Sequence, residues 1–102
     1  MPRPPAPSLL TVLLLAALLL AGCASPSAEF FGAPSQRVTV EGVEIVVYHR
    51  GARAQAIRMG RLARGEHGVT QARMVVATEQ VTGCAVTDAQ GDSGVMTLRL
   101  AC

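Results

Sequence analysis

The sequence predicts a small α+β domain in which one helix packs on one face of an antiparallel sheet of three or four strands. Two stretches, residues 37–50 and 95–102, alternate apolar with polar side chains, as half-buried strands do. Between them, residues 68–82 carry apolar side chains at helical spacing and are followed by Gly83. A weaker strand after the first stretch completes the expected order β-β-β-α-β.

Residues 37–50 are expected to form a β-hairpin around the two-residue turn Glu41-Gly42. This turn places apolar side chains of the two strands opposite one another, and all of them share one face. The expected pairs are Val40 with Val43 and Val38 with Ile45. Because the register and the hydrophobic pattern agree, this face is expected to cover the core.

The third strand is expected over residues 54–59, after a turn at 50–53. Its apolar pattern is weaker, with Ile57 and Met59 on one face. Residues 60–65 contain glycine and arginine and are expected to form a loop that leads into the helix.

The single helix of the domain is expected over residues 68–82. Glu66 near its start suits the positive end of the helix dipole, and Gly83 suits a left-handed C-terminal cap. Thr78 and Arg73 are expected to point outward. One line along the helix is expected to hold Val69, Ala72, Val76 and Gln80, with Met74, Ala77 and Val81 beside it.

The C-terminal part of the chain is expected to contain a loop and a last strand. Residues 85–94 are polar and rich in glycine and aspartate, which favours a loop. Residues 95–102 alternate again, and Cys102 has the parity of the apolar positions in that strand. It is therefore expected to face the helix, near Cys84 at the helix end.

The N-terminus holds an apolar run at residues 9–20, interrupted only by Thr11, and then Leu20-Ala21-Gly22-Cys23. A dozen apolar residues match a signal-peptide core and fall short of the ~20 that a membrane-spanning helix needs. A small pair directly before a cysteine resembles the cleavage and lipidation signal of bacterial lipoprotein precursors. The alternative is a plain signal peptide with an incidental cysteine.

The resemblance to lipoprotein precursors implies a location and an anchor. Residues 1–22 would be removed, and the sulfur of Cys23 would carry diacylglycerol that anchors the protein in a membrane of the cell envelope. The domain would face the periplasm. Ala24 follows the cysteine where an aspartate often signals inner-membrane retention, which favours the outer membrane.

The three cysteines of the chain are accounted for if Cys23 carries lipid. Cys84 and Cys102 then remain as a pair in an oxidising compartment, where a disulfide is expected. It would close a loop of about 18 residues and contribute ~3 kcal/mol in the chain-entropy model. Two free thiols or an intermolecular bond are the alternatives.

Three segments are expected along the chain: a signal peptide over 1–22, a lipidated and flexible tether over 23–36, and the disulfide-bonded domain over 37–102. The tether contains Phe30-Phe31, the only phenylalanines of the chain. They are expected either to dip into the lipid interface or to dock on the edge of the domain.

The basic residues form one candidate contact surface. Five arginines fall within a short stretch that contains no acid, and they could contact lipid phosphates, an anionic envelope polymer or an acidic protein. The alternative is an ordinary solvated surface. Export from the cytoplasm and the lack of aromatic platforms argue against nucleic acid. The five residues are Arg50, Arg53, Arg58, Arg61 and Arg64.

No catalytic or metal-binding residues are predicted. The tetrapeptide Gly91-Asp92-Ser93-Gly94 resembles the nucleophile segment of chymotrypsin-like proteases, but Val95 and not glycine follows it. A triad also requires a histidine that is oriented by a buried carboxylate. His49 and His67 lack metal-ligand spacing, and no cofactor is indicated.

These features favour a non-enzymatic envelope lipoprotein that binds an envelope protein or an anionic polymer. Binding by strand addition at the first or third strand is one route. An alternative is a small periplasmic inhibitor, similar to lysozyme inhibitors, and a third is a small hydrolase that uses one of the histidines. The sequence indicates no oligomeric state.

Overall fold

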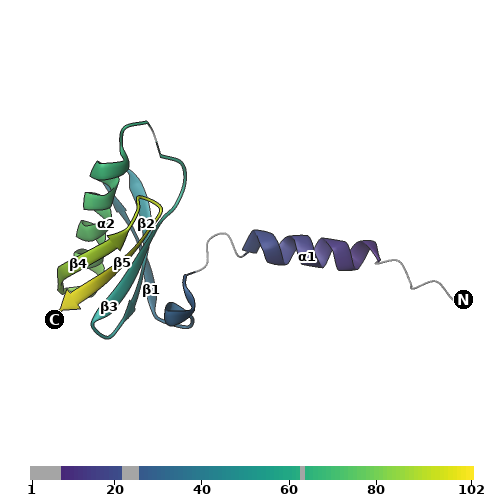
Figure 1. The fold of residues 1–102 in the computed structure, drawn as a ribbon, viewed down its shortest axis with the longest axis horizontal. Helices are drawn as coiled ribbons and strands as arrows, with labels where there is room; N and C mark the ends of the chain where they lie inside the picture. The colour runs from purple at the N-terminus through teal and green to yellow at the C-terminus, as the bar shows by residue number, and fades with distance from the viewer. Residues whose placement is uncertain (1–7, 22–25, 63) are drawn as a thin grey trace, which may run out of the picture.

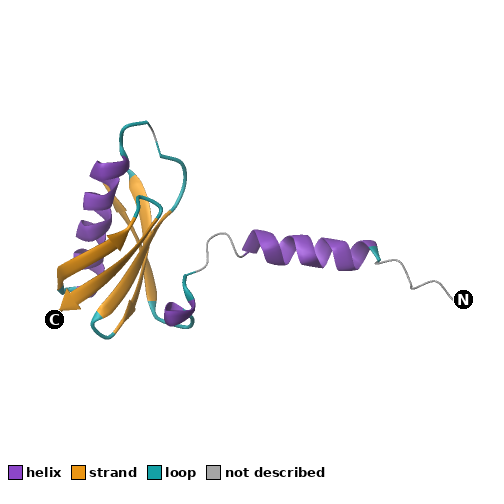
Figure 2. Ribbon diagram, in the orientation of Figure 1, coloured by secondary structure: helices purple, strands orange, loops and turns teal. Residues whose placement is uncertain are grey.

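The structure is a computed structural model that describes residues 8–21, 26–62 and 64–102. Its domain is one antiparallel sheet of five strands with one helix packed on one face, which confirms the α+β class (Figures 1 and 2). The strand order is β1-β2-β3-β5-β4. The elements are α1 (Leu9–Ala21), a 3-10 turn η2 (Ala28–Phe30), β1 (Ser35–Val40), β2 (Val43–Arg50), β3 (Arg53–Arg58), α2 (His67–Thr82), β4 (Ala85–Gly91) and β5 (Val95–Ala101).

The β1–β2 hairpin has the expected turn and register. Val40 pairs with Val43 and Val38 pairs with Ile45. Both turn residues have positive φ, 48° at Glu41 and 83° at Gly42, as the favoured two-residue hairpin turn requires. The hairpin thereby places Ile45 and Val47 in the core, where both are fully buried.

Strand β3 lies in the middle of the sheet, between β2 and β5, and is not an edge strand. The strand was expected to extend over residues 54–59 with Ile57 and Met59 on one face, but it ends at Arg58, and the side chains that pack against α2 are Ala54 and Ala56. Ile57 is buried on the opposite face, and Met59 lies beyond the end of the strand. A central strand covered on both faces loses its alternating pattern, which explains the error.

Helix α2 ends as expected. Gly83 has the left-handed φ of 71°, and its N–H donates to the Glu79 carbonyl at 2.9 Å. The predicted buried face is confirmed at Met74 and Ala77 but is wrong at Val69 and Val76, which are 52% and 42% exposed, and at Thr78, which is fully buried. The buried side chains are Thr70, Met74, Ala77 and Thr78.

Thr78 lies on the buried face of α2, where valine side chains were expected, because its hydroxyl has a hydrogen-bond partner within the helix. Its Oγ1 donates to the Met74 carbonyl at 2.8 Å, so the polar group is satisfied within the helix. The methyl group of the threonine is then available to the core. The apolar face of α2 is therefore rotated from the one that counting aliphatic side chains indicates.

Strand β4 occupies most of the predicted loop 85–94, which corrects that expectation. It is an edge strand whose side chains toward the core are Val86 and Ala89. These two are three residues apart, because the register shifts between Val86 and Asp88 and leaves Thr87 as a bulge. The bulge breaks the period of two, so the segment does not have the sequence pattern of a strand.

The disulfide between Cys84 and Cys102 is present, as expected, and joins the end of α2 to the end of β5. Their Cα atoms are 4.5 Å apart, within the range that a disulfide spans. Cys84 is buried, whereas Cys102 is exposed. The bond closes one end of the layer between the helix and the sheet.

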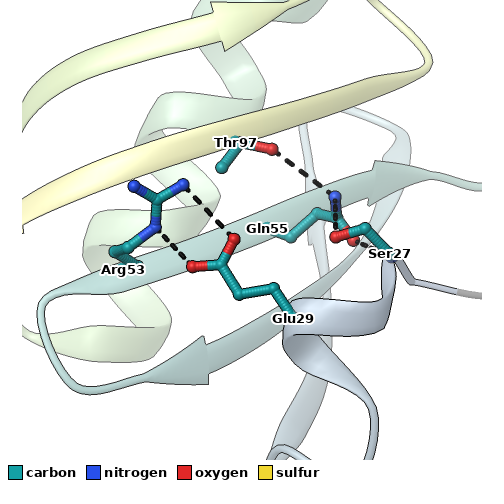
Figure 3. A network of polar contacts seen from close by, with 5 residues as sticks. All are labelled: Ser27, Glu29, Arg53, Gln55 and Thr97. Atoms are coloured by element: carbon teal, nitrogen blue, oxygen red, sulfur yellow. Dashed lines mark hydrogen bonds and ion pairs between the residues drawn. The ribbon is translucent and has the colours of Figure 1, made fainter.

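Part of the predicted tether is folded onto the domain. Phe30 is fully buried, and the backbone N–H of Ser27 donates to Oε1 of Gln55 at 2.8 Å. Figure 3 shows Ser27 and η2 lying over β3, on the face of the sheet opposite α2. We call this face of the sheet, the one that α2 does not cover, the open face. The structured domain therefore begins at Ser27, and the flexible-tether prediction for residues 27–36 is wrong.

Helix α1 is apolar except for Thr11, and its described leucines are exposed. Among the residues that the structure describes, no helix has the length and apolar character needed to cross a membrane.

Candidate functional site: an arginine-lined pocket beside the start of helix α2

The five predicted arginines do not form one surface. Arg50 and Arg53 flank the β2–β3 turn at one end of the sheet. The other three, Arg58, Arg61 and Arg64, lie at the opposite end, where β3 leads into the loop before α2. The two groups are separated by the length of β3.

The arginines at the β2–β3 turn hold the N-terminal segment. Arg53 forms an ion pair with Glu29, with an Nε–Oε1 distance of 2.5 Å and an Nη2–Oε2 distance of 3.3 Å (Figure 3). Arg50 donates from Nη2 to the Phe31 carbonyl at 3.0 Å. Both side chains therefore contact the N-terminal segment of the domain, Arg53 through Glu29 and Arg50 through the Phe31 carbonyl.

A pocket of about 250 Å³ lies at the other end of the sheet. Its wall is formed by the β1–β2 turn, the end of β3, the loop before α2 and the first turns of α2. Charged and apolar side chains both contribute. The lining residues are Glu41, Gly42, Val43, Arg58, Met59, Arg61, Leu62, Glu66 and Arg73.

Arg58 fixes the floor of this pocket by joining β3 to the β4–β5 turn. Its Nε donates to the Ser93 carbonyl at 2.8 Å, and its Nη1 donates to the Gly60 carbonyl. The backbone N–H of Arg58 donates to the Gly94 carbonyl at 2.9 Å. The guanidinium is therefore held in place at the pocket by backbone oxygens.

Arg73 was not among the predicted site residues. Its Nε lies 2.9 Å from Oε2 of Glu41, and its side chain is only 18% exposed. This ion pair joins α2 to the β1–β2 turn across one wall of the pocket. The two residues are far apart in the sequence, so no local pattern indicates the contact.

Arg61 and Arg64 supply the charge that the pocket offers to a partner. Both are exposed, and neither has a hydrogen bond or an ion pair within the described part of the chain. Arg61 lines the pocket and Arg64 lies in the turn that follows it. A carboxylate or phosphate group bound here would meet Arg61, which forms no ion pair among the described residues, although Glu66 also lines the pocket.

The β4–β5 turn brings Ser93 against His67, a contact that the sequence analysis did not predict. Nδ1 of His67 lies 2.6 Å from Oγ of Ser93, which is buried. The adjacent backbone N–H groups of Gly94 and Val95 both donate to Oδ1 of Asp92. These two N–H groups are therefore committed within the turn and are not aimed at a substrate oxygen beside Ser93.

The carboxylate of Asp92 is stabilised by the same turn. Hydrogen bonds from the backbone N–H groups of Gly94 and Val95 lower its pKa below the usual value of 3.8. Desolvation opposes this lowering of the pKa, and the smaller electrostatic effects of Arg58 and His67 act in the same direction as the hydrogen bonds. Asp92 thus serves the turn itself, as an Asx motif.

The remaining predicted residues lie elsewhere. A ring nitrogen of His49 and the sulfurs of Cys84 and Cys102 lie within 4.8 Å of one another, but both sulfurs are committed to the disulfide. Nε2 of His49 is also 2.8 Å from the Gly51 carbonyl. Cys23, the predicted lipidation site, lies outside the described residues.

Comparison with known proteins gives no relative for this chain. No protein family, no curated protein and no solved structure matches it significantly.

Proposed function

We propose that this chain is a lipid-anchored protein of the bacterial cell envelope and acts as a non-enzymatic binding module. The observation that carries the proposal is the disulfide between Cys84 and Cys102. It leaves Cys23 as the one cysteine without an intramolecular partner, directly after the apolar helix α1. A single thiol placed after an apolar helix too short to cross a bilayer suits removal of that helix and lipid attachment.

The binding surface in this proposal is the pocket beside the start of α2. Arg58 and Arg61 present guanidinium groups there, with Arg64 in the following turn, and Val43 and Leu62 add apolar contact area. Arginine pairs well with the carboxylates of an acidic protein and with the phosphates or carboxylates of an anionic envelope polymer. We therefore expect a partner that carries negative charge beside an apolar group.

The anchoring part is tested by expressing the whole precursor in a Gram-negative host. The wild type is expected to lack residues 1–22, to gain the mass of an acylated N-terminal cysteine and to enter the detergent phase on phase separation. A Cys23→Ser variant is expected to remain in the aqueous phase. A wild-type protein with an unmodified Cys23 thiol would contradict lipid attachment.

The binding part is tested by crosslinking in intact cells that carry the anchored protein. An Arg61→Ala, Arg64→Ala double variant is expected to lose the specific envelope partner that the wild type captures. Arg37→Ala is the matched control, because Arg37 is equally exposed but pairs with Glu44 on the open face. If both variants capture the same proteins as the wild type, the pocket is not the binding surface.

A further inference from the structure

The folded start of the domain leaves a very short connection to the proposed anchor. Ser27 is held by Gln55 through two hydrogen bonds, N–H to Oε1 at 2.8 Å and Nε2 to Oγ at 3.2 Å. Three residues lie between Cys23 and Ser27 in the sequence. At 3.8 Å for each Cα–Cα step, the Cα atoms of Cys23 and Ser27 are at most about 15 Å apart, whatever conformation that segment adopts.

The short connection determines which surface of the domain meets the membrane. Ser27 lies on the open face over β3, and α2 covers the other face (Figure 3). The helix layer adds about 10 Å of thickness on the far side of the sheet. A lipid attached to Cys23 can therefore bring the open face and its edge to the bilayer, while α2 stays farther away.

Phe31 and Arg50 form a surface suited to lipid headgroups at this edge. Phe31 is 60% exposed, although its neighbour Phe30 is fully buried. The Arg50 guanidinium is also exposed and is held beside it by the hydrogen bond to the Phe31 carbonyl. An exposed aromatic ring next to a cation is the combination that favours the interface between acyl chains and anionic phosphates.

We propose that Phe31 and Arg50 contact the headgroup region of the bilayer that holds the Cys23 lipid, with anionic phospholipid as the ligand of Arg50. This inference rests on the proposed lipidation of Cys23. It also orients the domain. Arg50 and Val43 are at opposite ends of β2, about 23 Å apart at 3.3 Å per residue, so the pocket stays clear of the bilayer.

The test uses a single fluorescent reporter, because the chain contains no tryptophan. The lipidated Phe31→Trp protein is placed in vesicles of phosphatidylcholine and phosphatidylglycerol that contain brominated acyl chains. Val76→Trp is the matched control, since Val76 is exposed on α2, away from the open face. We expect a blue shift and strong quenching for Phe31→Trp, and emission close to that in water for Val76→Trp.

The contribution of Arg50 is measured in the Phe31→Trp background. Arg50→Gln is expected to reduce quenching in vesicles that contain phosphatidylglycerol and to change little in pure phosphatidylcholine. Equal quenching of Phe31→Trp and Val76→Trp in protein that floats with the vesicles would overturn this inference alone. Protein that does not float with the vesicles would overturn both the inference and the lipid anchor.

Discussion

Gln55 holds Ser27 from the centre of the sheet. The side chain of Gln55 is almost fully buried, at 3% exposure, and it accepts from the Ser27 N–H while donating to the Ser27 hydroxyl. Its Nε2 also lies 3.5 Å from Oγ1 of Thr97 on β5 (Figure 3). A segment outside the sheet is thereby attached to its middle strand, next to the ion pair between Glu29 and Arg53.

Replacing Gln55 with alanine is expected to release the N-terminal segment. The part-buried hydrogen bond from the Ser27 N–H loses its acceptor, so the free energy of unfolding is expected to fall by about 0.5–1.5 kcal/mol. Hydrogen exchange of the Ser27 amide, compared with amides in β2, measures the local release. Gln90→Ala, an exposed site on the same face, is the control. An unchanged Ser27 amide would show that Phe30 alone holds the segment.

Phe30 and Phe31 are expected to differ sharply although they are neighbours. Phe30→Ala removes a fully buried ring and is expected to destabilise the domain by about 3–5 kcal/mol. Phe31→Ala removes an exposed ring and is expected to change stability by less than about 0.5 kcal/mol. Urea unfolding measures the loss of unfolding free energy in both variants. Similar losses of stability in the two would contradict the docked position of Phe30.

Reduction of the disulfide is expected to lower stability without changing the pocket. The bond spans 18 residues, and in the chain-entropy model its loss costs ~3 kcal/mol. Denaturant unfolding of the wild type and of a Cys84→Ser, Cys102→Ser double variant measures this loss of unfolding free energy. The intact mass of the wild type should rise by the mass of two hydrogens on reduction. A larger shift would indicate bonds to other molecules.

Asp92 is expected to make stability depend on pH under acidic conditions. Its pKa is lowered in the folded state by the N–H groups of Gly94 and Val95, so the unfolded chain binds the proton first as the pH falls. The stabilisation is therefore present above pH 3.8 and is lost as the pH falls below it. Thermal midpoints of wild type and Asp92→Asn should differ by a constant amount well above pH 3.8 and should converge as the pH falls below that value.

The control for this pH dependence is Asp88→Asn, which changes an exposed aspartate on β4 outside the turn. Its midpoint should differ from that of the wild type by a constant amount across the same range. If the difference between wild type and Asp92→Asn is also constant with pH, the carboxylate charge has no role in the turn.

Two glycine substitutions are expected to have opposite effects. Gly91 has a φ of 125°, and an added Cβ would meet the Val95 carbonyl oxygen, so Gly91→Ala is expected to destabilise by more than about 1 kcal/mol. Gly68 lies in the first turn of α2 with nothing near its Cβ position. Gly68→Ala is expected to stabilise by roughly 0.5–1 kcal/mol, because alanine favours the helix. Thermal unfolding measures both.

The parts of the fold that were predicted correctly are those where several local signals coincide. The Glu41-Gly42 turn, the alternation on both sides and the pairing of Val38 with Ile45 all specify one register. Gly83 ends α2 because only a residue tolerant of positive φ suits that cap. The disulfide was predicted correctly because the end of the helix and the parity of the last strand both place Cys84 and Cys102 on the same side of the sheet.

The parts that were missed depend on contacts that no local pattern records. The bulge at Thr87 shifts the alternation of β4, so a strand has the composition of a loop. Thr78 satisfies its hydroxyl inside the helix and so takes a place in the core. The ion pair between Arg73 and Glu41, which builds one wall of the pocket, joins residues that only the tertiary fold brings together.

The attachment of Ser27 to Gln55 also limits where an anchored copy of this protein can work. With the lipid on Cys23 and only three residues before the fold begins, the domain diffuses in two dimensions, within a layer little thicker than itself. If the proposed anchor is present, the domain could not extend far from the membrane to search for a distant ligand. Its encounters depend on surface density in the membrane, and a soluble partner has to come to the bilayer to be bound.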